Sequence, residues 1–338
     1  MKKKLTVFIT GAGTVTAISV IKGLKQQQEL DITICTADAA YNVAGRFFGD
    51  YFFKLPPASD PSFIKVLKTA IKKSRADILI PIIDYEFTKI ASHKQEFLEL
   101  GCTPIISDVA TIEKCIDKFK IADFFSSVDL KVPISYSKEE IKKINNIKFP
   151  LFIKPSYLGR STINSHKLEN KKDLDYYVDK VKAPIIQEFI DGTEITIDGI
   201  NDLQGNFIAA VPRIRIETKT GLSVKGETIK DTALIKKIKI IAEKLRIIGA
   251  FNVQCIKNKK NEYVFIEINP RFAGGHPLTI QAGLNSAYIL CKCFLKQPIE
   301  KKDIEIKKSV SMIRFWDEVF LNEKGKGFKP QLQLFDER

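Results

Sequence analysis

Apolar runs of strand length alternate with amphipathic segments in the first third of the chain. Four short runs are rich in β-branched residues, as expected of β-strands: 4–10, 31–38, 77–82 and 102–107. Three segments between them have the apolar spacing of helices: 15–27, 60–76 and 90–101. Because strands that alternate with helices form parallel sheets, we expect a doubly wound α/β unit that ends near residue 110.

The next segment, 111–130, has the spacing of one long amphipathic helix. Thr111 is the expected N-cap of this helix, and Asp117 and Lys118 lie off its apolar stripe. The stripe consists of these residues: Ile112, Cys115, Ile116, Phe119, Ala122 and Phe125.

The pattern changes near residue 150, where longer runs predict antiparallel strands. They cover 150–163 and 183–216, with turns expected at Asp191-Gly192 and Gln204-Gly205. The elements expected after them are a helix at 231–250, a strand hairpin at 251–270, another helix at 276–296 and a loose tail at 322–327. The later part of the chain therefore has the pattern of an α+β fold.

The length of 338 residues allows two or three domains. A run of about 18 apolar residues, which a membrane span needs, is not found. The first apolar run is too short for a signal peptide and leads into a Gly turn, so we expect a cytoplasmic location. The six cysteines and three histidines are scattered, which disfavours a zinc site and a disulfide scaffold.

The net charge of +14 raises the question of a polyanionic partner. The charge is mostly lysine spread along the chain, without a stacked aromatic platform or a DNA-binding motif. We therefore favour a solvated lysine-rich surface over nucleic-acid binding. An anionic substrate such as a nucleotide fits the charge equally well.

Polar residues occupy alternate positions along the stretch 263–275, YVFIEINPRFAGG, which predicts a strand that ends in a turn. Glu267, Asn269 and Arg271 share one face of this strand, because side chains alternate across a strand. The preceding strand offers Gln254 with Asn252 on the same parity, and a hairpin would place Gln254 beside Glu267. These residues suit a hard cation that bridges phosphates. The alternative is a solvated sheet face with an Arg–Glu pair.

Two weaker patterns lie upstream. Lys154 ends a strand, and a loop with one glycine follows it at 159–162, which suits phosphate binding or a plain β-turn. The strand at 183–190 breaks at Asp191-Gly192, where backbone groups suit an adenine edge and Glu194 suits ribose hydroxyls. A hairpin turn with an exposed glutamate is the alternative there.

Two further groups suit a substrate anion. Arg213 and Arg215 share one strand face, either as arms for a carboxylate or as part of a plain surface strand. Gly274, Gly275 and His276 precede a helix, whose N-terminus suits a second carboxylate or phosphate. His276 is equally well explained as a residue that only starts this helix.

The order of these groups along roughly residues 4–300 resembles the ATP-grasp superfamily. The pattern is similar to one synthetase half of the large chain of carbamoyl phosphate synthetase, and to related amino-acid ligases such as the lysine–ornithine-type ligase of pyrrolysine synthesis. The resemblance implies a Rossmann-like pre-ATP-grasp domain at 1–110, a small lid subdomain with a linker helix at 111–190, and a large subdomain at 191–338. The last two form an ATP-grasp domain of two α+β subdomains.

The resemblance also implies a role for each matching residue. Metal ligands for Mg²⁺ or Mn²⁺ would be Gln254, Glu267 and Asn269, and Arg271 would steady an acyl phosphate beside the catalytic Glu267 and Asn269. Substrate contacts would come from Arg213, Arg215, Gly274, Gly275 and His276. ATP contacts would come from Lys118, Lys154, Gly159, Arg160, Ser161, Glu188, Phe189, Ile190 and Glu194. Lys118 has a plain alternative, a solvated helix lysine.

The expected activity is that of an ADP-forming ligase, which joins a small carboxylate to an amine through an acyl phosphate. Alternatives are a synthetase-like enzyme that makes carboxyphosphate or a carbamoyl product, and a nucleotide-binding protein without turnover. The departures are a loop with a single glycine and a neutral Gln254 where many relatives have a carboxylate. The sequence leaves the acid, the amine and the oligomeric state open, with a homodimer as one alternative.

The first Gly-containing turn also resembles a dinucleotide-binding loop. Thr16 stands where the third glycine of such a motif belongs, although Asp38 lies where a ribose-binding acid would. The superfamily opens with such a domain without using it for NAD, so we expect Asp38 or the backbone of 11–14 to shape one end of the substrate cleft.

Overall fold

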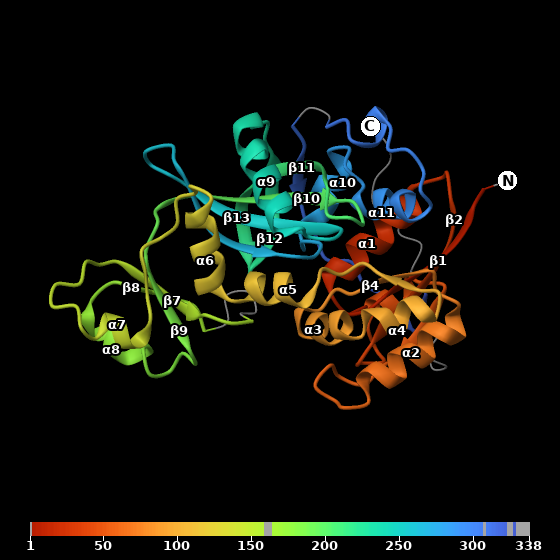
Figure 1. The fold of residues 1–338 in the computed structure, drawn as a ribbon, viewed down its shortest axis with the longest axis horizontal. Coiled ribbons are helices and arrows are strands. Elements are labelled where there is room, and N and C mark those ends of the chain that lie inside the picture. The colour runs from red at the N-terminus through yellow and green to blue at the C-terminus, as the bar shows by residue number, and fades with distance from the viewer. Residues whose placement is uncertain (1, 159–163, 307–308, 323–326, 329–338) are drawn as a thin grey trace.

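The computed structural model describes residues 2–158, 164–306, 309–322 and 327–328. The N-terminal part forms a five-stranded parallel sheet in the order β3-β2-β1-β4-β5 (Figure 1). Its strands are β1 (Lys4–Ile9), β2 (Asp31–Asp38), β3 (Tyr51–Lys54), β4 (Ile78–Ile80) and β5 (Thr103–Pro104). Its helices are α1 (Val15–Gln26), η1 (Ala44–Phe47), α2 (Phe63–Ser74), α3 (Asp84–Ser92) and α4 (Lys94–Glu99). The sequence prediction missed β3, and it merged the later part of α3 with α4 into one helix.

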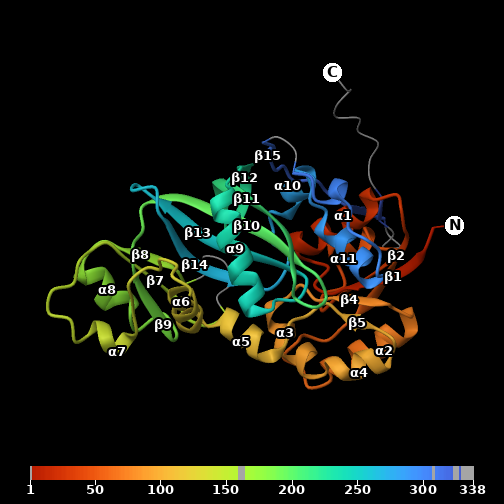
Figure 2. The same cartoon turned by 45° about the horizontal axis from the view of Figure 1, so that its top comes forward.

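Helices cover both faces of this sheet. Because successive side chains of a strand point to opposite faces, neighbouring residues of β1 belong to different cores. Val7 and Ile9 pack into a core beneath α1 and α11, whereas Phe8 packs with Phe63 and Phe87 beneath α2 and α3 (Figures 1 and 2). The helix α11 (Ser286–Phe294) lies far along the chain, so the C-terminal part closes one face of the N-terminal sheet.

The segment predicted as one helix forms two, α5 (Val109–Ile116) and α6 (Lys118–Ser127). Asp117 between them is extended and accepts hydrogen bonds from the N–H groups of Phe119 and Lys120, so it caps α6. The N-cap of α5 is Asp108 rather than the predicted Thr111. The break also turns Lys118 inward, so that only 8% of it is exposed, which excludes a solvated helix lysine.

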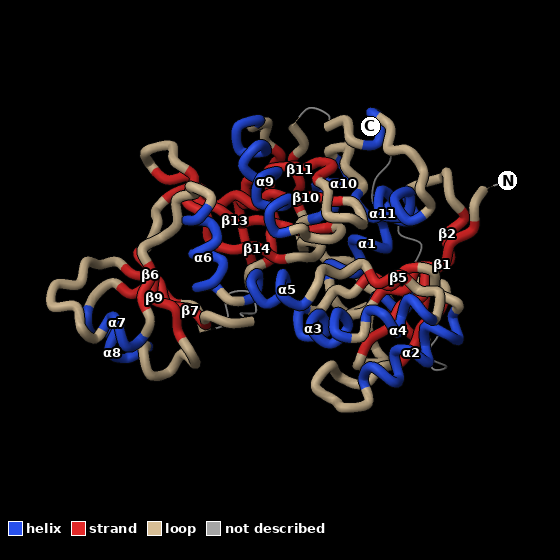
Figure 3. The backbone as a smooth tube through the Cα atoms, in the orientation of Figure 1, coloured by secondary structure: helices blue, strands red, loops and turns tan. Residues whose placement is uncertain are grey.

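A four-stranded antiparallel sheet in the order β6-β9-β7-β8 lies at the end of the molecule farthest from the N-terminal sheet (Figures 1 and 3). Its elements are β6 (Ser135–Tyr136), α7 (Lys138–Ile141), β7 (Leu151–Pro155), β8 (His166–Leu168), α8 (Lys171–Tyr177) and β9 (Pro184–Glu188). Its separate small core includes Ile153, Leu168 and Ile186.

The third sheet has six strands in the order β14-β13-β10-β11-β12-β15 and lies between the other two (Figure 1). Its strands and the helix packed on them are β10 (Gly192–Asn201), β11 (Phe207–Lys219), β12 (Leu222–Thr228), α9 (Thr232–Leu245), β13 (Ala250–Asn258), β14 (Tyr263–Asn269) and β15 (Ser311–Ile313). The remaining elements are α10 (His276–Gln281), η2 (Lys301–Asp303), β16 (Phe320–Leu321) and β17 (Gly327–Phe328). The predicted order of a parallel sheet followed by antiparallel sheets is confirmed.

Two turn predictions had different outcomes, and one helix prediction was wrong. The turn at Gln204-Gly205 joins β10 to β11 as predicted. The break at Asp191-Gly192 is no hairpin, because β9 and β10 belong to different sheets. The helix predicted at 276–296 is divided at Gly283, whose φ of 115° lies in the left-handed region and where a Cβ would overlap the carbonyl oxygen of Glu305.

All six cysteines have free thiols, five of them buried and Cys293 half-buried. Within the described ranges, no helix combines the length and the apolar character that crossing a bilayer requires.

Candidate functional site

A cavity of about 580 Å³ opens between the five-stranded and six-stranded sheets. Its floor comes from β13 and β14, and one wall comes from the ends of β1 and β4. Lys118 at the start of α6 and Lys154 in β7 close another side. Three separate sheets and the α5–α6 junction therefore contribute side chains to one site.

Ten of the residues predicted from the sequence line this cavity. They are Lys118, Lys154, Arg213, Arg215, Gln254, Glu267, Asn269, Arg271, Gly274 and Gly275. Other predicted residues do not line it: Glu188, Phe189, Ile190, Glu194 and His276. Gly159, Arg160 and Ser161 fall outside the described residues, so the predicted phosphate loop has no structural account.

The β13–β14 hairpin has the predicted register. Gln254 lies opposite Glu267, and Asn252 lies opposite Asn269. A bulge at Ile266 precedes Glu267, so Phe265 rather than Ile266 shares the core face with Ile268. The predicted polar face thus begins at this bulge.

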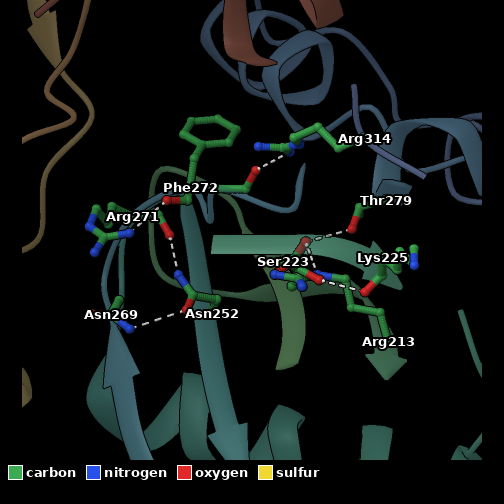
Figure 4. A network of polar contacts seen from close by, with 11 residues as sticks. Arg213, Ser223, Lys225, Asn252, Asn269, Arg271, Phe272, Thr279 and Arg314 are labelled. Carbon is green, nitrogen blue, oxygen red and sulfur yellow. Dashed lines mark hydrogen bonds and ion pairs between the residues drawn. The ribbon is translucent and has the colours of Figure 1, made fainter. Parts of the chain in front are cut away.

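Amide hydrogen bonds hold this polar face in place (Figure 4). Asn269 Nδ2 donates to Asn252 Oδ1 at 3.2 Å and to Glu267 Oε1 at 3.5 Å. Asn252 Nδ2 in turn donates to the carbonyl oxygen of Arg271 at 3.0 Å. Within the described residues the Asn269 carbonyl oxygen has no hydrogen-bond donor, so it is available to a ligand.

Glu267 lies among cationic groups. Burial by itself would raise the pKa of Glu267, but Lys154 and Lys118 lower it, so the net shift is downward and the carboxylate is ionised. Burial and the charge of Lys118 lower the pKa of Lys154 to about 8, against the opposing effect of Glu267. Two lysines around one carboxylate leave an excess of positive charge, which favours an anionic ligand.

Arg271 is held by Asp84, a residue that the sequence analysis did not single out. Arg271 Nε donates to Asp84 Oδ1 at 2.8 Å, and Nη2 donates to Oδ2 at 3.2 Å. Although burial disfavours its charge, this ion pair raises the pKa of Arg271. Its position could have indicated a role, because Asp84 follows a buried strand of a parallel sheet, where ligand-binding residues are commonly found.

The two arginines of β11 have different surroundings. Arg213 is only 3% exposed and forms a bidentate pair with Asp198 at 3.1 Å, which excludes the plain surface strand at this position. Thr279 also donates to Asp198, on the side of Arg213 that Figure 4 shows. The guanidinium of Arg213 lies against Gly275. A side chain at position 275 would overlap this guanidinium.

Arg215 connects the cavity to Glu194. Its Nη1 lies 3.1 Å from Glu194 Oε2 and donates to Gln254 Oε1 at 3.3 Å, while Nη2 donates to the carbonyl oxygen of Gly221. Burial lowers the pKa of Arg215, and Glu194 opposes this shift.

The predicted adenine segment has part of its backbone occupied. The N–H of Glu188 donates to the carbonyl oxygen of Ile134 at 2.9 Å, and its carboxylate accepts from the N–H of Ile134. The N–H of Phe189 donates to the carbonyl oxygen of Pro150 at 3.2 Å.

His276 is 2% exposed and packs edge-on against Phe272, away from the cavity.

The donor set fits a hard cation in part. Glu267 supplies an ionised carboxylate and Asn269 a free carbonyl oxygen, which are oxygen ligands of the kind that Mg²⁺ takes beside phosphates and water. Gln254 Oε1 accepts from Arg215, so this oxygen has only one lone pair left for a cation. Among the described residues, no group of three or more His, Cys, Asp or Glu side chains could hold a metal by itself.

The Gly11–Thr14 turn uses its own N–H groups. The N–H of Ala12 donates to the carbonyl oxygen of Ala37 and that of Thr14 to Gly11, while Gly13 donates to Asp38 at 2.7 Å. The other carboxylate oxygen of Asp38 accepts from Ala40 at 2.8 Å. These N–H groups would contact the pyrophosphate of a dinucleotide, so their internal pairing disfavours NAD binding.

Two protein-family models match the chain. Residues 7–105 match the PylC-like N-terminal domain, and residues 180–316 match the family described as ATP-grasp in the biosynthetic pathway with Ter operon. The carbamoyl phosphate synthase large chain of Helicobacter pylori is 24% identical over 301 residues, which is 82% of this chain. The chain spans only 26% of that relative's length.

Solved structures share the fold at low sequence identity. The biotin carboxylase domain of 2-oxoglutarate carboxylase from Hydrogenobacter thermophilus, solved with MgADP and bicarbonate, matches with a TM-score of 0.72 at 14% identity, covering 97% of this chain and 83% of that one. The L-amino acid ligase from Bacillus licheniformis matches with a TM-score of 0.66 at 17% identity, covering 92% and 79%. The parallel sheet, the two antiparallel sheets and both family matches agree, and the chain belongs to the ATP-grasp superfamily, with a PylC-like N-terminal domain.

Proposed function

We propose that this protein is an ATP-dependent ligase that joins a carboxylate to an amine and releases ADP and phosphate. The observation that carries the proposal is the gathering of Glu267, Asn269, Lys154, Lys118 and Arg271 in one cavity. The L-amino acid ligase that shares the fold supports amide formation as the reaction.

The proposed reaction has two steps. A carboxylate oxygen of the acid attacks the γ-phosphorus of ATP, and the bond to the bridging oxygen of ADP breaks. The amine nitrogen then attacks the acyl carbon, phosphate leaves with the bonding electrons, and the nitrogen loses a proton. Both steps depend mainly on holding reactants in place and on neutralising phosphate charge.

The cavity residues divide this work. Lys118 and Lys154 would bind phosphate oxygens, and Arg271 would stabilise negative charge on the transferred phosphate. Glu267 and Asn269 would hold Mg²⁺ or Mn²⁺, which when bound neutralises charge between neighbouring phosphates. Arg213, Gly274 and Gly275 would form the end that receives the acid's carboxylate, with Arg215 beside them. His276 would support this end from behind rather than touch the substrate.

The nucleoside would extend from the cavity toward the strand β9. We propose that Ile190 offers its backbone N–H to adenine, since within the described residues no acceptor is found for this group. Glu188 and Phe189 flank it, and Glu194 would exchange its pair with Arg215 for ribose hydroxyls. Gly159, Arg160 and Ser161, which lie outside the described residues, stay proposed phosphate contacts.

The three sheets support the division proposed from the sequence. The five-stranded sheet lies within 1–110, the four-stranded sheet within 111–190 and the six-stranded sheet within 191–338. We propose these ranges as the N-terminal domain, the lid subdomain and the large subdomain.

The variant Glu267→Gln tests the proposed site. It keeps the shape of the side chain and removes the negative charge, so ADP release should fall by roughly 10²-fold or more. The assay is a screen for ADP release with paired acids and amines, with mass detection of the condensed product. Glu262→Gln, in the turn of the same hairpin and outside the cavity, is the matched control and should keep full activity. Near-normal ADP release by Glu267→Gln contradicts the assignment.

A second candidate is a reaction that begins with bicarbonate. The biotin carboxylase domain with bicarbonate and the carbamoyl phosphate synthase large chain both favour it. ADP release that requires bicarbonate and proceeds without an amine would support this candidate over the ligase.

A further inference from the structure

A second cavity of about 510 Å³ lies at the carboxyl edge of the parallel sheet. Its lining comes from the carboxyl ends of four parallel strands and the segments after them: Gly11 after β1, Asp38 at the end of β2, the loop at 55–59 after β3, and Ile83 to Lys89 after β4. The strand order changes direction between β1 and β4, because β2 and β3 lie on one side of β1 and β4 on the other. In open α/β sheets, ligands bind at such a point.

The second cavity adjoins the first. Ile83 and Tyr85 line both cavities, and Asp84 between them holds Arg271. A ligand in the second cavity would therefore lie beside the proposed site of phosphoryl transfer, separated from it by one short segment.

The walls of this cavity are mainly apolar. Leu55, Pro56, Pro57 and Ala58 form one side, and Ile83 forms part of another. Such walls suit an aliphatic chain, and they leave few polar groups to select the ligand.

Two of the polar residues that line the cavity are acidic, Asp38 and Glu86. Glu86 is 5% exposed and accepts a hydrogen bond from the hydroxyl of Thr10, and the carboxylate of Asp38 also faces the cavity. Lys89 is the only Lys or Arg among the described lining residues. Burial raises the pKa of Glu86 to about 8, and the charges of Asp38 and Asp84 add to this shift while Thr10 opposes it. No ion pair joins Glu86 to a cation within the described ranges. An ammonium bound beside Glu86 would stabilise its ionised form, which burial by itself disfavours.

We propose that this cavity binds the amine substrate, as an alkylammonium whose charged head lies against Glu86 and Asp38 and whose chain lies along the proline-lined wall. The proposal rests on the ligase function above and assigns the amine a site of its own, apart from the acid. The bound ammonium would then transfer one proton to the carboxylate of Glu86, and the neutral amine would pass the segment at 83–85 to reach the acyl phosphate.

Binding of simple probes tests this site without turnover. Ligand-observed NMR titrations at pH 7 would compare pentylamine with 1-pentanol, which has the same chain without the charge. The wild type should bind pentylamine at least about tenfold more tightly than 1-pentanol, and saturating Mg-ATP should not displace it. Displacement by Mg-ATP, equal binding of both probes, or no binding of pentylamine would overturn the proposal.

Three variants locate the probe. Glu86→Gln should abolish the preference for pentylamine over 1-pentanol, and Ala58→Phe should weaken both by filling the cavity. Glu99→Gln, an exposed acid at the end of α4, is the matched control and should bind as the wild type does. Unchanged preference in Glu86→Gln together with unchanged binding in Ala58→Phe would refute the site. A circular dichroism spectrum identical to that of the wild type shows that each variant is folded.

The variant Lys89→Met distinguishes two classes of ligand, an amino acid and a simple amine. With 6-aminohexanoate as the probe, a loss of affinity in Lys89→Met that pentylamine does not show identifies an amino acid as the ligand class. Equal effects on both probes identify a simple amine.

The failure of this proposal is distinct from the failure of the ligase function. ADP release with an unchanged KM for the amine in Glu86→Gln would refute the second site alone. Pentylamine binding in a protein that releases no ADP with any acid and amine would refute the ligase function alone.

Discussion

Glu267 and His276 lie nine positions apart, yet their surroundings shift their protonation in different ways. Glu267 remains ionised in spite of burial because Lys154 and Lys118 face it. His276 has no comparable compensation: burial lowers its pKa to about 4, and within the described residues its Nε2 has no hydrogen-bond partner. A buried neutral histidine of this kind supports the loop at Gly274 and Gly275 by packing, not by charge.

The depressed pKa of His276 makes folding sensitive to acid. Above pH 6.5 the imidazole is neutral in both states, whereas between pH 6.5 and about 4 only the unfolded chain binds the proton. The free energy of unfolding should therefore fall as the pH drops through this window, by at most roughly 1.4 kcal/mol per pH unit from this group.

Denaturant titrations from pH 7 to 4 measure this effect. The variant His276→Phe removes the titrating group and should show a shallower loss of stability over the same window. An equal slope in the variant and the wild type would contradict the assignment of the shift to His276.

Some residues of the site were predictable because their signal is local. Alternation along one strand placed Glu267 and Asn269 on one face, and the short hairpin placed Gln254 beside them. Asp84 and Asp198 carried no comparable signal. The partner of Asp84 is Arg271, 187 positions away, so only the folded chain brings these two together. The partner of Asp198 is Arg213 on the neighbouring strand β11, where the polar pattern does not by itself indicate a buried ion pair.

At the scale of elements, the break between α5 and α6 determines where Lys118 lies. The apolar stripe continues through the break with nearly helical spacing, which is why periodicity alone predicts one helix. Asp117 stops the first helix and caps the second, and Lys118 becomes the first residue of α6, with its N–H donating to the carbonyl oxygen of Ser156 at 2.8 Å. The cap therefore positions a proposed ATP contact.

Variants at the two helix caps distinguish an effect on stability from an effect on ATP binding. Asp108→Ala and Asp117→Ala each remove a capping carboxylate, and each should lower the free energy of unfolding by about 1 kcal/mol. Only Asp117→Ala should also raise the KM for ATP, because only that cap is followed by a residue of the cavity. Chemical denaturation and ADP-release kinetics provide the two measurements. An equal KM in both variants would show that the cap does not position Lys118.

At the scale of the whole molecule, the site exists only where separate sheets meet. Asp84 follows a strand of the parallel sheet, and Arg271 follows a strand of the six-stranded sheet, 187 positions later. Their bidentate pair thus joins the two sheets at the centre of the cavity. We expect this pair to aim the guanidinium rather than to supply much net stability.

The variant Asp84→Asn tests this positioning role. The kcat for ADP release should fall by about tenfold or more while the KM for ATP changes little, because Arg271 loses its orientation after the phosphates have bound. Asp84→Glu, which keeps the charge, should recover part of the loss.

The matched control is Asp303→Asn. It breaks the buried pair with Lys292, where both side chains are 4% exposed, far from the cavity. This variant should lower stability without changing the kcat. If both aspartate variants lose the same stability and Asp84→Asn keeps its kcat, the pair has only a structural role.

The sequence alone determined the class of each sheet, the hairpin that carries Glu267 and the set of polar residues worth testing, because strand and turn patterns are local and repeat every few residues. The tertiary structure alone decided that Lys118 is buried, that Asp84 holds Arg271, that Asp191-Gly192 joins two sheets and that a second cavity adjoins the first. These features depend on contacts between segments far apart in the chain. A periodic pattern records which face of an element is apolar, but it does not record which distant element covers that face.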